Sequence, residues 1–489
     1  MAPKVRCLMV VFLILLLSSA VSSSVWAGSG SEEESIKTVR MSLEAKGESE
    51  YALEYLFETP YMEQRRGNGA LLYETALTLM DGVKSDLVDF DEDKLGEWQR
   101  MEPEDMPLEE VRKTVSRFDR VIYYAELASK CDYCAWEYPI REEGLACVMP
   151  SLGGFRTLCR ILALKARLAA ADGDIDEAMR ALRIGISMGR DVGDGPFLVQ
   201  GLVGVAVNAV MIREAQRLIE LPETPNLYWA LTSLPRPMIG MHRAMQVESA
   251  MLYVELPELQ TLDTEVWSDE EALRVGRKIV ALMSGGWSGD EDQPESLLAK
   301  GAMLASAMML YPEAKQGLIE QGSAVEEVEA MPPLQVILMY KHRQYRRVMD
   351  MHFKWCNLPY WQAKEGFERA RQALDEYRGG SKLDVIANML MYTMPAIDRV
   401  CFLRARFDRD LDMLRCVEAI RIYAAEHDGK LPRSLDDIST VPVPMDPIYG
   451  RAFHYEVDGK TCVLESPVPE GGHAREGLRY EITMKTASP

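Results

Sequence analysis

Most of the chain has the periodicity of helices. Apolar residues recur at three- and four-residue intervals from Ile36 to about residue 394. This spacing places apolar side chains on one face of an α-helix, so it predicts a body built from packed helices. Residues 201–215 are strongly apolar and predict a helix at the centre of the core. In this segment, Gly201 and Gly204 are spaced for close approach of a neighbouring helix.

The clearest pair of helices is predicted between residues 158 and 192. Residues 161–170 and 176–189 have helical periodicity, and the sequence DGD at residues 172–174 predicts a tight turn between them. Small residues such as Ala166 and Ala178 fall where a tetratricopeptide (TPR) helix pair needs close contact. Because no second copy follows at a 34-residue step, the pattern predicts one TPR-like hairpin in an irregular helical body.

The pattern changes near the C-terminus. A long amphipathic helix is predicted from Ile397 to about His427, and three alternating segments typical of strands follow at 452–457, 460–466 and 478–484. Asp458 and Gly459 separate the first two segments and are suited to a two-residue hairpin turn. The predicted fold class is therefore mostly α, with an irregular helical-hairpin body at 28–394. A small α+β module, made of a long helix and a short antiparallel sheet, follows at 395–489.

The first residues have the pattern of a signal peptide. Lys4 and Arg6 precede an uninterrupted apolar run at residues 7–17, and a serine-rich stretch leads to Val25 and Ala27. An apolar run of this length is shorter than the ~20 residues that a membrane-spanning helix needs. We expect an exported chain, in the periplasm or cell envelope, that is cleaved near Ala27; retention of the segment as an anchor is the alternative. No later segment predicts a transmembrane span.

The charge of the chain argues against one class of partner. The sequence has 55 Lys and Arg against 76 Asp and Glu, which gives a formal net charge of −21. An acidic surface repels phosphate backbones, so we expect no nucleic-acid partner. Walker A, HExxH, GxSxG and EF-hand patterns are absent from the sequence, and nothing in it predicts a cofactor or a metal site.

Four cysteines cluster within 29 residues of the chain. They are Cys131, Cys134, Cys147 and Cys159. In an exported protein such clustering predicts at least one disulfide bond among them, with the pairing left open. The CxxC spacing of Cys131 and Cys134 also occurs in zinc and redox sites, but the surrounding sequence supplies neither two further ligands nor a βαβ context.

The strongest local charge anomaly is a basic run at residues 341–347. It contains Lys341, Arg343, Arg346 and Arg347, and His352 follows on the same predicted helix. One interpretation is a patch that binds a carboxylate, a phosphate or an acidic segment of a partner. The other is a solvated helix face whose charges are balanced by neighbouring acids. His352 and Cys356 are four residues apart and share one helix face, but two ligands do not define a metal site.

The C-terminal segments resemble a known family. The sequences KLPRSLDDI at 430–438 and VPMDPIYG at 443–450, with the helix before them and the hairpin after them, resemble the C-terminal part of the major pseudopilin of type II secretion systems. The resemblance implies a helix-plus-sheet assembly module. Some 370 residues precede this module here, whereas a pseudopilin begins with its hydrophobic helix, and the calcium ligands of that family are not matched.

Other segments resemble uncharacterised exported bacterial proteins that join a helical body to such a module. They are residues 68–73, 331–336 and 354–363. This resemblance implies an architecture and no activity. Two hypotheses on function follow: a non-catalytic interaction or scaffold protein that binds another envelope protein, or an enzyme or small-ligand-binding protein with a site in a helical cleft near residues 341–361. The absence of a catalytic motif favours the first, and the oligomeric state stays open.

Overall fold

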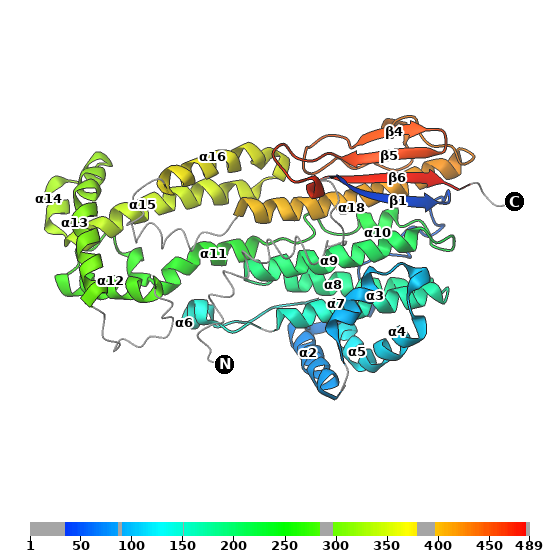
Figure 1. The fold of residues 1–489 in the computed structure, drawn as a ribbon, viewed down its shortest axis with the longest axis horizontal. Coiled ribbons are helices and arrows are strands. Elements are labelled where there is room, and N and C mark those ends of the chain that lie inside the picture. Colours follow the sequence, from blue (N-terminus) through cyan, green and yellow to red (C-terminus); the bar gives the residue numbers. More distant parts are fainter. Residues whose placement is uncertain (1–34, 87–89, 150, 284–296, 379–396, 486–489) are drawn as a thin grey trace. The chain divides into compact units, whose positions relative to one another are not determined.

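The computed structural model describes residues 35–86, 90–149, 151–283, 297–378 and 397–485 (Figure 1). The predicted signal peptide therefore lies outside the described residues. The described residues form two compact units. Those within 138–148 and 245–401 make up the helical unit, and those within 23–137, 149–244 and 402–489 make up the sheet-containing unit. Each unit draws on segments from both sides of residue 394, where the sequence predicts a boundary.

The predicted fold class is confirmed, since helices dominate and the main sheet is small. The helices of the sheet-containing unit are α2 (Gly69–Asp86), α3 (Glu92–Arg100), α4 (Leu108–Val115), α5 (Asp119–Ser129), α7 (Leu152–Ala171), α8 (Ile175–Gly193), α9 (Leu198–Ile219) and α10 (Tyr228–Thr232). Helices α11 (His242–Glu255) and α18 (Ile397–Glu426) each belong partly to one unit and partly to the other. Short 3₁₀ helices are η2 (Tyr61–Glu63), η3 (Pro103–Asp105), η4 (Ser116–Phe118), η5 (Gly144–Ala146), η6 (Pro257–Gln260), η7 (Lys354–Asn357), η8 (Leu435–Asp437) and η9 (Ala474–Glu476).

Helices α7 and α8 form the hairpin that the sequence predicts. Asp174 caps α8, because its side chain accepts a hydrogen bond from the Glu177 N–H at 3.0 Å. Gly173 takes a left-handed conformation, with φ of +77°, which lets the chain reverse between the two helices.

The close helix contact predicted from the glycine spacing is confirmed at Gly204. A Cβ atom there would lie 2.5 Å from the Gly189 carbonyl oxygen and 2.5 Å from the Gly193 Cα. Only glycine allows the backbones of α8 and α9 to cross at this distance. Among the described residues, α9 is the helix long and apolar enough to span a membrane, but 89% of its most apolar 18-residue window is buried inside the protein.

The main sheet has four strands, β1 (Lys37–Leu43), β4 (His454–Asp458), β5 (Thr461–Ser466) and β6 (Leu478–Met484), in the order β1-β6-β5-β4 (Figure 1). The three C-terminal strands were predicted from the sequence, and they pair antiparallel. The hairpin turn lies one residue later than predicted. Asp458 pairs with Thr461, so Gly459 and Lys460 are the turn residues, and Gly459 has the positive φ that the turn requires.

Strand β1 corrects the prediction of helix from Ile36 onward. It pairs parallel to β6, with Val39 opposite Tyr480 and Leu43 opposite Met484. Met41 and Leu43 are buried, whereas Thr38, Arg40 and Ser42 are exposed, which is the two-residue period of a half-buried strand. Seven residues are too few for periodicity alone to separate a strand from the start of a helix.

Local turn chemistry leads the chain from α18 into the sheet as the sequence predicts. Gly429, at φ of +79°, donates its N–H to the Ala424 carbonyl at 2.8 Å and so ends the helix. The Asp446 side chain accepts a hydrogen bond from the Ile448 N–H at 2.8 Å, and Gly450 again has a positive φ.

The helical unit is built around α15. Its helices are α6 (Ile140–Glu143), α12 (Asp269–Met283), α13 (Leu297–Glu320), α14 (Val325–Ala330), α15 (Pro333–Phe353) and α16 (Tyr360–Arg378). Pro333 occupies the first turn of α15, where its missing N–H costs nothing. Val336 and Ile337 of α15 lie in one apolar core with Ala314 and Leu318 of α13 and Val275 of α12. Because these residues are buried in the core, the opposite faces of the three helices are the ones at the surface.

Candidate functional site

The basic run on α15 splits between internal contacts and the surface. Lys341 is buried, with its Nζ 3.7 Å from Glu313 Oε1 and 5.4 Å from the centre of the Tyr340 ring. Arg343 is half-buried; its Nε donates to Asp263 Oδ1 at 2.8 Å and its Nη1 to Ser323 Oγ at 3.2 Å. These two cations therefore serve the packing of the helical unit.

Arg346 and Arg347 are the two members of the run that are exposed. At about 100° per residue, Arg343, Arg346 and Arg347 share one face of α15, whereas Lys341 points to the opposite side. Lys341 is buried on one side of the helix while Arg346 and Arg347 face solvent. Of the predicted patch, Arg346 and Arg347 therefore lie at the surface beside the half-buried Arg343, while Lys341 and His352 are buried.

Both histidines of α15 are buried and held by internal contacts. His342 Nε2 lies 3.1 Å from the Tyr253 hydroxyl oxygen, and the two rings meet edge to face. Burial lowers the pKa of His342 to about 4, so this imidazole is neutral at pH 7. The Nδ1 of His352 lies 2.9 Å from the Val348 carbonyl oxygen, one turn back on its own helix.

Within the described residues, no group of three or more His, Cys, Asp or Glu side chains is placed to hold a metal ion. The Cys356 thiol, four residues from His352, lies 3.8 Å from the His352 carbonyl oxygen. It also lies 3.4 Å from Cys401 Sγ, a contact that the sequence did not predict.

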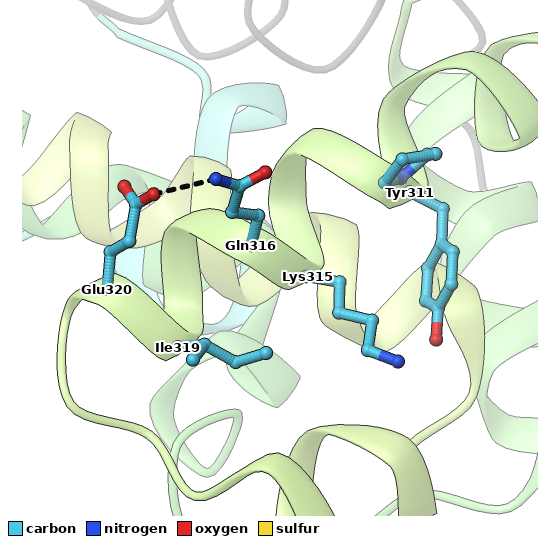
Figure 2. A pocket seen from close by; sticks show the side chains of 6 residues that line it. Tyr311, Lys315, Gln316, Ile319 and Glu320 are labelled. Atoms are coloured by element: carbon cyan, nitrogen blue, oxygen red, sulfur yellow. Dashed lines mark hydrogen bonds between the residues drawn. The ribbon is translucent and has the colours of Figure 1, made fainter.

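One shallow hollow of the helical unit lies on the outer face of α13 (Figure 2). It has a volume of about 500 Å³ and is lined by Tyr311, Pro312, Lys315, Gln316, Ile319 and Glu320. Tyr311 and Lys315 extend to the same side of the helix, and Gln316 donates to Glu320 at 2.9 Å. Lys315 is paired with Glu329 at 2.7 Å. The lining is mostly apolar and offers no combination of nucleophile and base.

A second hollow, of about 530 Å³, lies in the sheet-containing unit beside the Asp446 turn. Asp446 is buried, and its carboxylate accepts hydrogen bonds from the Ser466 hydroxyl at 2.6 Å and from the Ile448 N–H. Burial raises the pKa of Asp446 above its usual value. These hydrogen bonds hold the Asp446–Pro447 turn against β5. They account for the buried carboxylate without a bound ligand.

The four clustered cysteines are free thiols in the structure. Cys131 begins β3 (Cys131–Tyr133), which pairs with β2 (Arg65–Asn68), and Cys159 is buried in α7. Cys147 belongs to the helical unit, whereas the other three belong to the sheet-containing unit. Burial raises the pKa of Cys134 far above its usual value, which keeps this thiol protonated and unreactive.

An exposed apolar segment in the sheet-containing unit was missed by the sequence reasoning. Residues 51–62, here called the apolar segment, carry four large side chains with high exposed fractions. These are Tyr51 (65%), Leu53 (68%), Tyr61 (84%) and Met62 (91%). Its residues lack helical periodicity, and the only signal in the sequence is the density of aromatic and apolar residues among glutamates.

The apolar segment is held in place by specific contacts. Phe57 is buried with 1% of its surface exposed. The Leu56 carbonyl accepts a hydrogen bond from Arg183 Nε at 3.1 Å, and the Thr59 hydroxyl donates to the Ser129 carbonyl at 3.2 Å. The exposed side chains therefore project from a fixed backbone.

Comparison with known proteins identified no similar protein. No family model matches the chain, and no curated protein and no solved structure matches it.

Proposed function

We propose that this chain is a non-catalytic interaction protein of the bacterial cell envelope, and that it binds another envelope protein through the apolar segment at residues 51–62. The observation that carries the proposal is the exposure of Tyr61 and Met62, at 84% and 91%, on a fixed backbone. Large apolar side chains gathered at a protein surface are typical of interaction sites. Aromatic and methionine side chains are also enriched in interface cores.

The charge around the segment specifies the partner. Residues 48–63 contain five glutamates and no Lys or Arg. Glu50 and Glu54 are exposed, whereas Glu58 and Glu63 pair with Arg190 and Lys130 of the same unit. A complementary partner surface is an apolar groove with basic side chains opposite Glu50 and Glu54, since opposite charges at the rim of an interface steer association and suppress wrong partners.

The contacts on α15 support this proposal over a ligand-binding cleft. Lys341, Arg343, His342 and His352 are engaged in contacts within the helical unit. A catalytic base or an anion-binding cation needs to reach a substrate. Side chains that are held in contacts within the protein are not available to contact a substrate.

Site-specific photo-cross-linking in the native cell envelope tests the proposal. p-Benzoylphenylalanine in place of Tyr61 and, separately, in place of Tyr51 is expected to capture the same protein. The same probe in place of Tyr123, an exposed tyrosine of α5 (54%), is the matched control and should not capture it. Adding Met62→Asp to the Tyr51 probe should abolish the adduct, and the adduct should weaken as salt rises.

Two results would refute the interaction site. One is an identical set of adducts at Tyr61 and at Tyr123. The other is an unchanged Tyr51 adduct after Met62→Asp. If no partner is captured while His352→Ala or Arg346→Ala abolishes a measurable small-ligand activity, the ligand-binding hypothesis replaces this one.

The location is a separate part of the proposal. It rests on the charged start, the short apolar run and the Val25–Ala27 ending of the first segment. N-terminal sequencing of the protein from native envelopes is expected to begin at or near Gly28. Recovery of the chain from the cytosol with Met1 or Ala2 at its N-terminus would contradict export.

A further inference from the structure

Two cysteines distant in sequence meet in the helical unit. Cys356 lies in η7, directly after α15, and Cys401 lies in the first turns of α18. The Cys401 thiol donates to Cys356 Sγ, with the two sulfur atoms 3.4 Å apart. Neither cysteine forms a disulfide in the structure. We propose that Cys356 and Cys401 are a redox-active dithiol that closes to a disulfide when it meets a disulfide oxidant.

The elements around the pair hold the two sulfurs at this distance. Trp355, next to Cys356, packs directly on α16, because a Cβ added at Gly366 would lie 2.2 Å from the Trp355 ring. The guanidinium of Arg369 on α16 lies 5.5 Å from the centre of the same ring. The end of α15 is therefore fixed on α16.

The start of α18 is fixed on the same helix. Arg371 Nη2 of α16 lies 2.5 Å from Asp398 Oδ2, one turn before Cys401. Ile397 and Val400, on either side of Asp398, are buried. With η7 and α18 both held on α16, the thiol contact follows from the packing of three elements.

The separation is suitable for a covalent bond. A disulfide has an S–S length of about 2.0 Å, so the sulfurs need to approach by about 1.4 Å from their 3.4 Å contact. Rotation about the Cα–Cβ bond of a cysteine moves its sulfur by more than this.

The difference in exposure sets the order of the reaction. Cys356 is half-buried, whereas Cys401 has only 2% of its surface exposed. Cys356 is therefore the thiol that meets an oxidant, and Cys401 is the thiol that resolves the intermediate.

Oxidised glutathione serves as the oxidant of this step. The Cys356 thiolate attacks one sulfur of oxidised glutathione, forms a mixed disulfide and expels one glutathione thiolate. The Cys401 thiolate then attacks Cys356 Sγ, forms the Cys356–Cys401 disulfide and expels the second glutathione thiolate. The two protons that leave the cysteines are taken up by the two glutathione thiolates. The protein loses two electrons, and oxidised glutathione gains them.

Peptide mapping of the native full-length chain tests the proposal. After incubation of reduced protein with oxidised glutathione, the remaining thiols are blocked and the protein is digested with trypsin without reduction. We expect residues 355–364 (WCNLPYWQAK) linked to residues 400–404 (VCFLR), with a mass two hydrogens below the sum of the two thiol peptides. Free Cys356 and Cys401 after incubation, or a bond from either to another cysteine, would overturn the proposal.

Single variants test the order of the two steps. Cys401→Ser should accumulate glutathione on Cys356, and Cys356→Ser should leave Cys401 as a free thiol. The matched control is Cys416→Ser, which removes another buried cysteine of α18 and should leave the 356–401 link intact. Accumulation of glutathione on Cys401 in Cys356→Ser would refute the assigned order. Peptide mapping of the wild-type chain shows whether the Cys356–Cys401 disulfide forms, even where a variant fails to fold.

Discussion

At the scale of single residues, the fold buries an ion pair between two helices. Arg167 of α7 and Glu214 of α9 are 4% and 2% exposed at their side chains, and they form a bidentate pair at 2.7 and 2.8 Å. Arg167 also donates to the Trp98 and Met101 carbonyls, so its guanidinium joins α7 to the end of α3. Each of these donors has a partner, which is the condition for burying a guanidinium.

Glu214→Ala is expected to lower the free energy of unfolding by about 3–5 kcal/mol, because it leaves the Arg167 charge buried without its carboxylate. Urea denaturation followed by circular dichroism measures the change. The control is Asp172→Ala, which breaks the exposed Arg112–Asp172 pair and should have a much smaller effect. Equal effects of the two variants would show that the buried pair has no special role.

Asp191 is a carboxyl group to which no cation among the described residues donates a hydrogen bond. Its Oδ2 accepts a hydrogen bond from the Tyr73 hydroxyl at 2.9 Å, and burial raises its pKa to about 7. The unfolded carboxyl has a pKa near 3.8. Between these two values the folded state keeps a proton that the unfolded state has released, so the stability falls as pH rises from about 4 to about 7.

Asp191→Asn is expected to remove most of this loss, because the amide is neutral and its oxygen still accepts from Tyr73. The variant should match the wild type near pH 4 and exceed it at pH 7, by up to on the order of 4 kcal/mol. The measurement is the free energy of unfolding of the wild type and of Asp191→Asn across this pH range. Asp81→Asn, at an exposed site of α2, is the control; parallel pH profiles for wild type and Asp191→Asn would contradict the assignment.

At the scale of elements, strand β1 is the part of the sheet that comes from the other end of the chain. Leu43 is fully buried at the end of β1, beside Met484 of β6. Arg40 and Glu481, on the exposed face, pair at 3.0 Å across the same two strands. The apolar face of β1 therefore completes the core of a sheet whose other strands are all C-terminal.

Leu43→Ala should lower the free energy of unfolding of the sheet-containing unit by about 2–5 kcal/mol, as expected for a large-to-small change at a fully buried leucine. The neighbouring Ser42→Ala, on the exposed face of the same strand, is the matched control and should be nearly neutral. Chemical denaturation of both variants provides the comparison. A loss for Ser42→Ala as large as that for Leu43→Ala would indicate that β1 does not contribute through its buried face.

At the scale of the whole molecule, the chain folds as two compact units that are each assembled from separate segments. Leu43 lies in the core of the sheet-containing unit, and Val336 of α15 is fully buried in the core of the helical unit. Each compact unit has its own apolar core, which is the property that allows separate cooperative unfolding.

Differential scanning calorimetry is expected to resolve two transitions. Leu43→Ala should lower the midpoint of one transition, and Val336→Ala should lower the midpoint of the other. A single transition that both substitutions shift equally would show that the two units unfold as one.

The sequence by itself determined the features that depend on neighbouring residues. The α7–α8 hairpin, the C-terminal strands and the Gly429 helix end were all predictable, because helix periodicity, strand alternation and glycine turns act over a few residues. The close approach at Gly204 was also visible in the glycine spacing, although its partner glycines at 189 and 193 were not.

Only the tertiary structure decided which distant residues meet. The pairing of β1 with β6 joins residues more than 400 positions apart, and no local pattern encodes such a partner. The basic run reads as one charged patch in the sequence, but the packing of α15 buries Lys341 and exposes Arg346. The contact of Cys356 with Cys401 likewise follows from the packing of η7 and α18 on α16. Local sequence patterns determine where this chain forms helices and strands. Burial of their apolar faces against one another determines which of them pack together.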